Sequence, residues 1–354
     1  MRATERDASR MTHAVNVSPH RPHALNRHSI MAPQQRSLGS TGFTIAPLVL
    51  GTNVFGWTID EPTSFSVLDA FVDAGFNAID TADVYSRWAP GNSGGESEAI
   101  IGRWLKRDPS RRDRVRLLTK VGGDMRGRGR KDLSKAWIRE AVEDSLRRLQ
   151  VETIDLYQAH WPDPATPYEE TLSTFAELMQ SGKVRAIGAS NHDASQLAEA
   201  LRVADERRLP RYATLQPLYN LYDRGSYDGA LRDLAIRERL GVIPYYGLAS
   251  GFLTGKYRSH SDLSKSPRGG GVARYLDERG MRILAALDEV GRRHSAQPAE
   301  VALAWLMQRD GVTAPIASAT SREQLASLVH AAELRLSPED VATLDDASAE
   351  APLA

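Results

Sequence analysis

The chain has 354 residues, and its 45 lysines and arginines are balanced by 45 aspartates and glutamates. Zero formal charge argues against a global attraction to nucleic acid or to an anionic membrane. The absence of cysteine excludes disulfides, thiolate nucleophiles and cysteine metal sites, and a 41% hydrophobic, 25% charged composition excludes collagen, disordered and polytopic membrane proteins. The length allows two or three ordinary domains, or one α/β barrel.

Residues 1–35 differ from the rest of the chain, because they are rich in arginine and histidine and show no apolar periodicity. Such a segment is predicted to be a disordered leader. Its acidic residues and prolines argue against a transit peptide, and it has no apolar core of a secretory signal. An upstream start codon or a cloning leader, with Met31 as the natural beginning, explains it most simply. We therefore expect a cytoplasmic protein with a single domain over 36–354.

The segment 37–45 that follows the leader, with glycines at its turn, is typical of a β-hairpin that closes the lower end of a barrel. Eight short apolar runs come next and alternate with stretches of helical periodicity. The runs are Leu48–Leu50, Asn77–Ile79, Val115–Val121, Ile154–Ala159, Val184–Gly188, Tyr212–Gln216, Val242–Tyr246 and Val312–Ile316.

The alternation of strand and helix indicates βαβ units around a parallel sheet. Eight units close an α/β (β/α)8 TIM barrel, whereas a doubly wound sheet has fewer strands and a glycine-rich first turn, which is missing here. After the seventh strand, the stretch 248–277 is too long for an ordinary connection, so we expect a lid or binding loop there.

Helix positions follow from apolar spacing and from capping residues. Residues 135–149 place their apolar side chains on one face of a helix. N-caps of further helices are predicted at Thr166 (with Pro167 at N1 and Glu169), Asp193 (with Gln196), Ser321 (with Gln324) and Ser337 (before Pro338).

Three ionisable residues end consecutive predicted strands, namely Asp80, Lys120 and His160. Because the carboxyl ends of barrel strands share one rim, we expect these side chains to lie together. Tyr85 comes five residues after Asp80 and can fold back over the same rim. Asp83, between them, is expected to be solvated or to cap the loop.

These four side chains form a set suited to carbonyl chemistry. A phenol is a poor acid near neutral pH unless a cation favours the phenolate, and Lys120 is expected to lower the pKa of Tyr85 in this way. Asp80 would neutralise and orient the lysine, while His160 would align the carbonyl oxygen. A buried Asp80–Lys120 ion pair, a core histidine and a rim tyrosine are the structural alternatives for the individual residues.

At this point the sequence resembles the aldo-keto reductases, over about Arg36 to Ser348. The motifs that carry the resemblance are Asp80-Thr81-Ala82 with Tyr85, Gly95-Glu96-Ser97-Glu98, Leu118-Thr119-Lys120, Asp155-Leu156-Tyr157 with His160, Gly188-Ala189-Ser190-Asn191, and Leu253-Thr254-Gly255-Lys256-Tyr257. The resemblance implies a (β/α)8 barrel, an NAD(P)H-dependent oxidoreductase, and a catalytic tetrad of Asp80, Tyr85, Lys120 and His160.

The resemblance also implies the cofactor-binding residues. Ser190, Asn191 and Gln216 match the residues that bind the carboxamide, and Tyr245 matches the tyrosine that stacks on the nicotinamide. The full expected set is Gly51, Thr52, Asn53, Asp80, Ser190, Asn191, Gln216, Tyr245, Tyr246, Gly247, Leu248, Ser250, Gly251, Leu253, Lys256, Ala317, Ser318, Thr320, Arg322 and Gln324.

The adenosine end departs from the family pattern. Many relatives carry arginine where Thr320 stands and asparagine where Leu328 stands, so Arg322 is the best replacement for binding a 2′-phosphate. An exposed residue on a first helical turn is the alternative for Arg322. We expect NADPH (NADP+) as the cofactor, with NADH possible.

The substrate site is expected where Trp57, Trp88 and Trp161 crown the barrel beside Tyr85 and His160. A basic run over 126–131 follows the third strand, and most such runs are solvated. The sequence leaves open an aldehyde, a bulky ring ketone, a xenobiotic or a keto-sugar.

The function expected from the tetrad is NADPH-dependent reduction of a small-molecule carbonyl, without a metal, nucleic acid or membrane partner, in a monomer or homo-oligomer. Two alternatives stay open. One is a regulatory nucleotide-binding module similar to potassium-channel β subunits, and the other is alcohol oxidation with NADP+. The physiological direction, the oligomeric state and the carbonyl substrate are not determined by the sequence.

Overall fold

The computed structural model describes residues 33–350 except positions 126, 128, 267 and 268. The fold described below is that of the unit formed by residues 32–354. The predicted leader therefore lies outside the described residues, apart from its last three positions.

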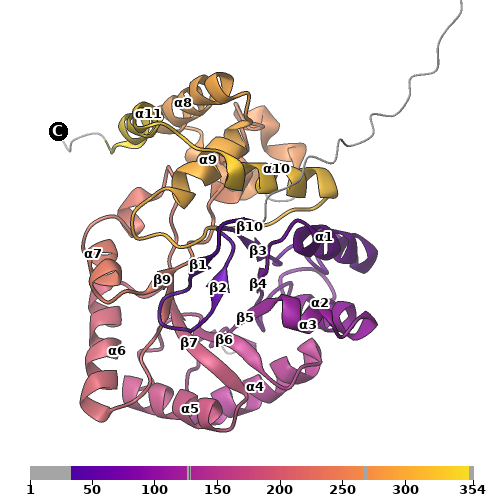
Figure 1. The fold of residues 1–354 in the computed structure, drawn as a ribbon, viewed down its shortest axis with the longest axis vertical. Helices are drawn as coiled ribbons and strands as arrows, with labels where there is room; N and C mark the ends of the chain where they lie inside the picture. Colours follow the sequence, from indigo (N-terminus) through magenta and orange to yellow (C-terminus); the bar gives the residue numbers. More distant parts are fainter. Residues whose placement is uncertain (1–32, 126, 128, 267–268, 351–354) are drawn as a thin grey trace, which may run out of the picture. The chain divides into compact units, whose positions relative to one another are not determined.

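Eight parallel strands form one curled sheet, in the order β10-β3-β4-β5-β6-β7-β8-β9 (Figure 1). Their bounds are β3 (Val49–Gly51), β4 (Ala78–Asp80), β5 (Arg116–Val121), β6 (Ile154–Ala159), β7 (Val184–Ser190), β8 (Thr214–Gln216), β9 (Gly241–Val242) and β10 (Ile316–Ala317). Backbone N–H groups of Thr313 and Ile316 donate to the carbonyls of Val242 and Pro244, each at 2.8 Å, and thereby join the two edges. The sheet closes, which confirms the predicted barrel.

The last two strands are shorter than the sequence predicts. The seventh run ends as a strand at Val242, with only an isolated bridge from Tyr245 to Leu218 beyond it, and the eighth begins at Ile316 instead of Val312. Pro244 and Pro315 have no N–H group, so each interrupts the hydrogen-bond ladder at these positions. The sixth strand likewise starts two residues later than predicted.

The strands are connected by helices that lie around the sheet in Figure 1. Their bounds are α1 (Glu61–Asp73), α2 (Glu96–Arg107), α3 (Arg111–Arg114), α4 (Lys135–Leu149), α5 (Tyr168–Gln180), α6 (Ala194–Arg207), α7 (Ala230–Arg237), α8 (Glu278–His294), α9 (Pro298–Met307), α10 (Arg322–Glu333) and α11 (Pro338–Ser348). Within the described part of the chain, no helix has the length and apolar character needed to cross a membrane.

Most predicted helix starts are confirmed. Asp193, Ser321 and Ser337 each cap their helix by accepting a backbone hydrogen bond. The predicted cap at Thr166 is wrong, because Pro167 is the N-cap of α5 and makes no side-chain cap bond. The hydroxyl of Thr166 donates to Oδ2 of Asp163 at 2.7 Å and thus belongs to the turn before the helix.

The core has two parts, one between the sheet and the helices and one inside the barrel. The inner part contains Val49, Ala78, Leu118, Leu156, Ala186, Ile243, Ala314 and Ile316, together with Leu38 and Ile45. The last two belong to the hairpin of β1 (Arg36–Ser37) and β2 (Thr44–Ile45). The hairpin thus fills one end of the barrel, as predicted.

The connection after β9 is the long loop that the sequence indicates. It contains three 3₁₀ segments, at Ala249–Thr254, His260–Lys265 and Gly269–Tyr275. The backbone turns sharply at its start, where Ser250 has φ 58° and Gly251 has φ 95°. This turn brings the loop beside the carboxyl ends of the strands, where it lines the cavity described next.

Candidate active site

Four polar side chains meet at the carboxyl end of the barrel, as the strand positions predict. Asp80 ends β4, Lys120 lies in β5 and His160 follows β6, while Tyr85 comes from the loop after β4. Parallel pairing brings Asp80 opposite Leu118, two residues before Lys120. The pairing register of β4 and β5 therefore places Asp80 and Lys120 at the same end of the barrel, and both side chains are positioned by strands.

Lys120 is the centre of the hydrogen-bond network. Its Nζ donates to Oδ2 of Asp80 at 2.6 Å, to the carbonyl of Thr81 at 2.8 Å and to the phenol oxygen of Tyr85 at 2.9 Å. The phenol also lies 3.4 Å from Oδ2 of Asp80. The ring of His160 lies 6.0 Å from that of Tyr85, edge to face.

Amide groups hold the second oxygen of Asp80. Nε2 of Gln216 donates to Oδ1 at 2.9 Å, and Nε2 of Gln158 lies 3.5 Å from the same atom. All three side chains are buried. Their hydrogen bonds fix the carboxylate, which in turn fixes the ammonium of Lys120 against the phenol.

Burial dominates the protonation of this group. It raises the pKa of Tyr85 well above its usual value, and the Asp80 carboxylate raises it further. The net direction is thus opposite to the lowering expected from Lys120 alone. Burial lowers the pKa of Lys120, although Asp80 opposes the effect. Burial, with the charges of Lys120 and Lys131, lowers the pKa of His160 and favours its neutral form.

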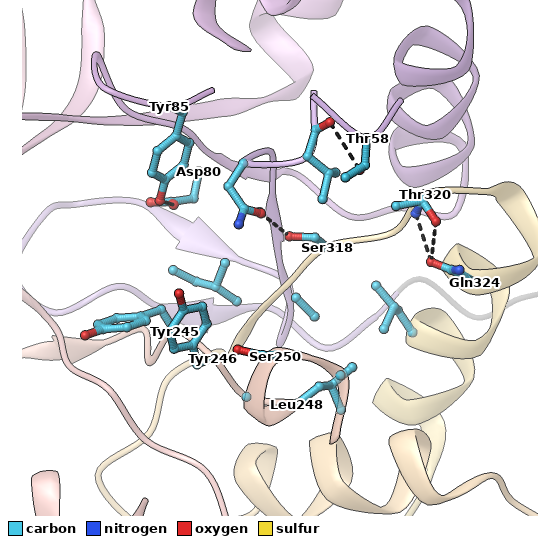
Figure 2. A pocket seen from close by; sticks show the side chains of 18 of the residues that line it. Thr58, Asp80, Tyr85, Tyr245, Tyr246, Leu248, Ser250, Ser318, Thr320 and Gln324 are labelled. Carbon is cyan, nitrogen blue, oxygen red and sulfur yellow. Dashed lines mark hydrogen bonds between the residues drawn. The ribbon is translucent and has the colours of Figure 1, made fainter. Parts of the chain in front are cut away.

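These residues open onto a cavity of about 1040 Å³ that runs toward α10. In Figure 2, Tyr85 and Asp80 lie on one side, Tyr245 and Tyr246 on another, and Thr320 with Gln324 at the far end. The predicted residues that line it are Gly51, Asn53, Trp57, Asp80, Tyr85, Trp88, His160, Trp161, Ser190, Asn191, Gln216, Tyr245, Tyr246, Gly247, Leu248, Ser250, Gly251, Lys256, Ala317, Ser318, Thr320 and Gln324.

Three of the predicted cofactor residues lie away from the cavity wall. Thr52 is buried and donates to the carbonyl of Asp80 at 2.9 Å. Leu253 is buried in the outer core, and Arg322 is exposed on the first turn of α10. Lys120, also off the wall, lies directly behind Tyr85.

A hydrogen-bonded chain connects the polar side chains next to Tyr245. The hydroxyl of Tyr245 donates to Oδ1 of Asn191 at 2.6 Å, and Nδ2 of Asn191 donates to the carbonyl of His160 at 2.8 Å. Ser190 donates to the carbonyl of Gln216 at 2.9 Å. The hydrogen bond to Asn191 therefore holds the ring of Tyr245 at the cavity wall.

The cavity also includes residues that the sequence does not single out, among them Lys265, Gln297 and Ser327. Nζ of Lys265 donates to the backbone carbonyl of Lys256 at 3.0 Å and pairs with Oδ1 of Asp262 at 2.7 Å. Neither periodicity nor motif spacing distinguishes a cofactor-binding lysine from other lysines in a glycine-rich loop. The glycines do indicate a binding loop, so every cation in that loop is a candidate for binding the cofactor.

Asp83 corrects the expectation of a solvated side chain. It is 1% exposed, and neither carboxyl oxygen has a hydrogen-bond partner in the described part of the chain. Burial and the nearby Glu98 raise its pKa to about 8, against the opposing charge of Arg148. The neighbouring ion pairs, Glu98 with Arg148 and Asp80 with Lys120, are already complete. Burial therefore favours the protonated, neutral form of the Asp83 carboxyl.

Comparison with known proteins identifies relatives over most of the chain. Residues 47–349 match the model of the Aldo/keto reductase family. "Protein tas" of Escherichia coli (strain K12) is 31% identical over 336 residues, which cover 88% of this chain and 96% of that protein. "Uncharacterized oxidoreductase YrpG" of Bacillus subtilis (strain 168) is 36% identical over 324 residues, covering 87% and 94%. "L-glyceraldehyde 3-phosphate reductase" of Escherichia coli O157:H7 is 30% identical, covering 88% and 91%.

Proposed function

The chain belongs to the aldo/keto reductase family, whose members are NAD(P)H-dependent oxidoreductases, and from that premise we propose that it reduces an aldehyde or ketone with NADPH, using Tyr85 as the proton donor. The observation that carries the proposal is the contact of Lys120 with both Asp80 and the phenol of Tyr85, at 2.6 and 2.9 Å. A structural ion pair alone would not need the phenol at the cavity wall.

In this proposal Tyr85 keeps its proton until negative charge develops on the substrate oxygen. Burial raises the pKa of Tyr85 and so supports a protonated phenol in the free protein. The ammonium of Lys120 then stabilises the phenolate left after the transfer, and Asp80 holds that ammonium in place. His160, favoured in its neutral form, hydrogen-bonds the carbonyl oxygen and aligns it with the phenol.

The cavity fits a dinucleotide. Its volume lies at the upper end of the range for ligand sites, and polar groups are present at both ends. Tyr245 offers an aromatic face for the nicotinamide, with Ser190, Asn191 and Gln216 near its carboxamide. Thr320 and Gln324 are at the other end, where the adenosine would lie. When bound, the nicotinamide supplies the hydride.

The charge of the long loop supports NADPH over NADH. Lys256 and Lys265 both line the cavity; Nζ of Lys265 already pairs with Oδ1 of Asp262 at 2.7 Å, so Lys256 is the ammonium better suited to a phosphate. Arg322 is exposed two residues before Gln324, so it stays the candidate on the helix side. Together these residues give the 2′-phosphate two sources of positive charge.

The test is the oxidation of NADPH and of NADH by the purified protein with a panel of aldehydes and ketones. We expect multiple turnovers with at least one carbonyl class and a higher kcat/KM with NADPH. Tight nucleotide binding without turnover on any compound would contradict the proposal and favour a regulatory binding module.

A further inference from the structure

The indole of Trp161 is covered on both faces. The ring of His160 stacks on it with the centroids 3.6 Å apart and the planes inclined by 18°. Nζ of Lys131 lies 3.7 Å from the Trp161 ring. A stacked ring and an ammonium cannot both occupy one face at such distances, so they lie on opposite faces. His160, Trp161 and Lys131 therefore form a three-layer stack.

This stack changes the role expected for Trp161. As a substrate wall, Trp161 would offer a free face to a ring compound, but both of its faces are taken. Trp161 lines the cavity and can present only its edge. Trp57 and Trp88, which meet edge to face at 5.6 Å, are left as the tryptophan wall.

The loop that carries Lys131 is tied to the loop that carries Trp161. The backbone N–H of Leu133 donates to Oδ2 of Asp163 at 2.9 Å, and Asp163 is 8% exposed. Lys131 and Trp161 each lie two residues before one of these partners. The buried hydrogen bond thus fixes the two loops relative to each other at the level of the stack.

Lys131 also differs from its neighbour in the basic run. Arg130 is exposed, and its Nη2 lies 3.8 Å from Oδ2 of Asp132, which is typical of a surface ion pair. The ammonium of Lys131 instead faces an aromatic ring, which attracts a cation through its quadrupole. Lys131 is partly exposed, so within this run it combines a solvent-facing position with an aromatic contact.

We propose that Lys131 is a positioning residue, which clamps Trp161 against the imidazole of His160 and so holds that imidazole in the orientation that receives the substrate oxygen. The proposal rests on the proposed carbonyl reduction. Without the clamp, Trp161 has an open face toward its loop and the imidazole loses its fixed support. Lys131 and Lys120 also disfavour the charged imidazolium, while the Tyr85 phenol is the other titratable group beside the ring.

The test compares Lys131→Met, which keeps most of the apolar stem and removes the charge, with Lys131→Arg, which keeps a cation. Arg130→Met is the matched control, because it removes a charge from the same loop outside the stack. Nuclear magnetic resonance follows the titration of His160, assigned with a His160→Gln variant, and steady-state kinetics give kcat and KM.

For Lys131→Met we expect the His160 titration midpoint to shift upward and kcat/KM to fall about fivefold, with nucleotide affinity unchanged. Lys131→Arg and Arg130→Met should resemble the parent protein. An unshifted His160 titration in Lys131→Met, or kinetics within about twofold of the parent, would overturn the proposal. The titration needs no turnover, so an inactive parent protein would refute the proposed function while His160 still reports on the clamp.

Discussion

Nζ of Lys120 lies 2.6 Å from Oδ2 of Asp80, and both side chains are buried. An ion pair in this position is costly to break, because the remaining charge stays in a poorly solvated site. The same contact holds the lysine against the phenol of Tyr85. Stability and the proposed chemistry therefore depend on one pair.

Asp80→Asn is expected to lower the free energy of unfolding by about 3–5 kcal/mol, since it leaves Lys120 buried without its carboxylate. Urea unfolding at neutral pH measures the change. Glu199→Gln is the control, because the Glu199–Arg202 pair is exposed and screened by solvent, so its loss should cost much less. Equal losses in the two variants would contradict the buried-pair account.

Asp83 gives stability a pH dependence. Its pKa of about 8 in the folded protein exceeds the unfolded value, so between about pH 4 and 8 the folded state holds a proton that the unfolded state has lost. The contribution of Asp83 therefore decreases as pH rises, by up to about 1.4 kcal/mol per pH unit.

Asp83→Asn should flatten this slope and raise stability near pH 8 relative to the parent protein. Urea unfolding of both proteins at several pH values between 4 and 8 measures it. Parallel stability curves for the two proteins would show that Asp83 does not hold the extra proton.

The two loop lysines are expected to decide nucleotide preference. In a Lys256→Met/Lys265→Met variant, the Kd for NADPH should rise about tenfold or more, while that for NADH changes less than about threefold, because only NADPH carries the 2′-phosphate. Fluorescence titration measures both. Lys106→Met, on α2 and away from the cavity, is the control. An equal loss for both nucleotides would argue against recognition of the 2′-phosphate by these lysines, because the two nucleotides share the pyrophosphate.

A substitution at the hairpin end of the barrel should lower stability and leave nucleotide binding unchanged. Leu38→Ala removes a fully buried side chain from the inner core and should cost about 2–5 kcal/mol of unfolding free energy. Nucleotide Kd should not change, because the cavity lies at the opposite, carboxyl end of the strands. A large change in Kd at full folding would contradict this separation.

Much of the architecture could be predicted, because the strands and helices of a barrel alternate and each has its own local apolar periodicity. The apolar runs predicted the positions of all eight strands. Because the carboxyl ends of successive parallel strands share one rim, Asp80, Lys120 and His160 come together there. The strand limits were less accurate where Pro244 and Pro315 interrupt the hydrogen-bond ladder, since an apolar run continues through a proline but its pairing does not.

The remaining features depend on contacts between distant loops. Lys131 and Trp161 are 30 residues apart and meet only because two loops pack together. Asp83 is buried near the charges of Glu98 on α2 and Arg148 on α4, and Lys265 reaches the cavity from the long loop. No periodicity or motif spacing in the sequence indicates these contacts.

The central claim is that Tyr85 donates the proton to the carbonyl. Nucleotide affinity and turnover of Tyr85→Phe, measured with the best substrate of the panel, test it most directly. We expect NADPH affinity to stay within about threefold of the parent and kcat to fall at least about 100-fold, since the aromatic ring remains and only the acid is lost. Retention of more than about a tenth of the parent kcat would contradict the assignment.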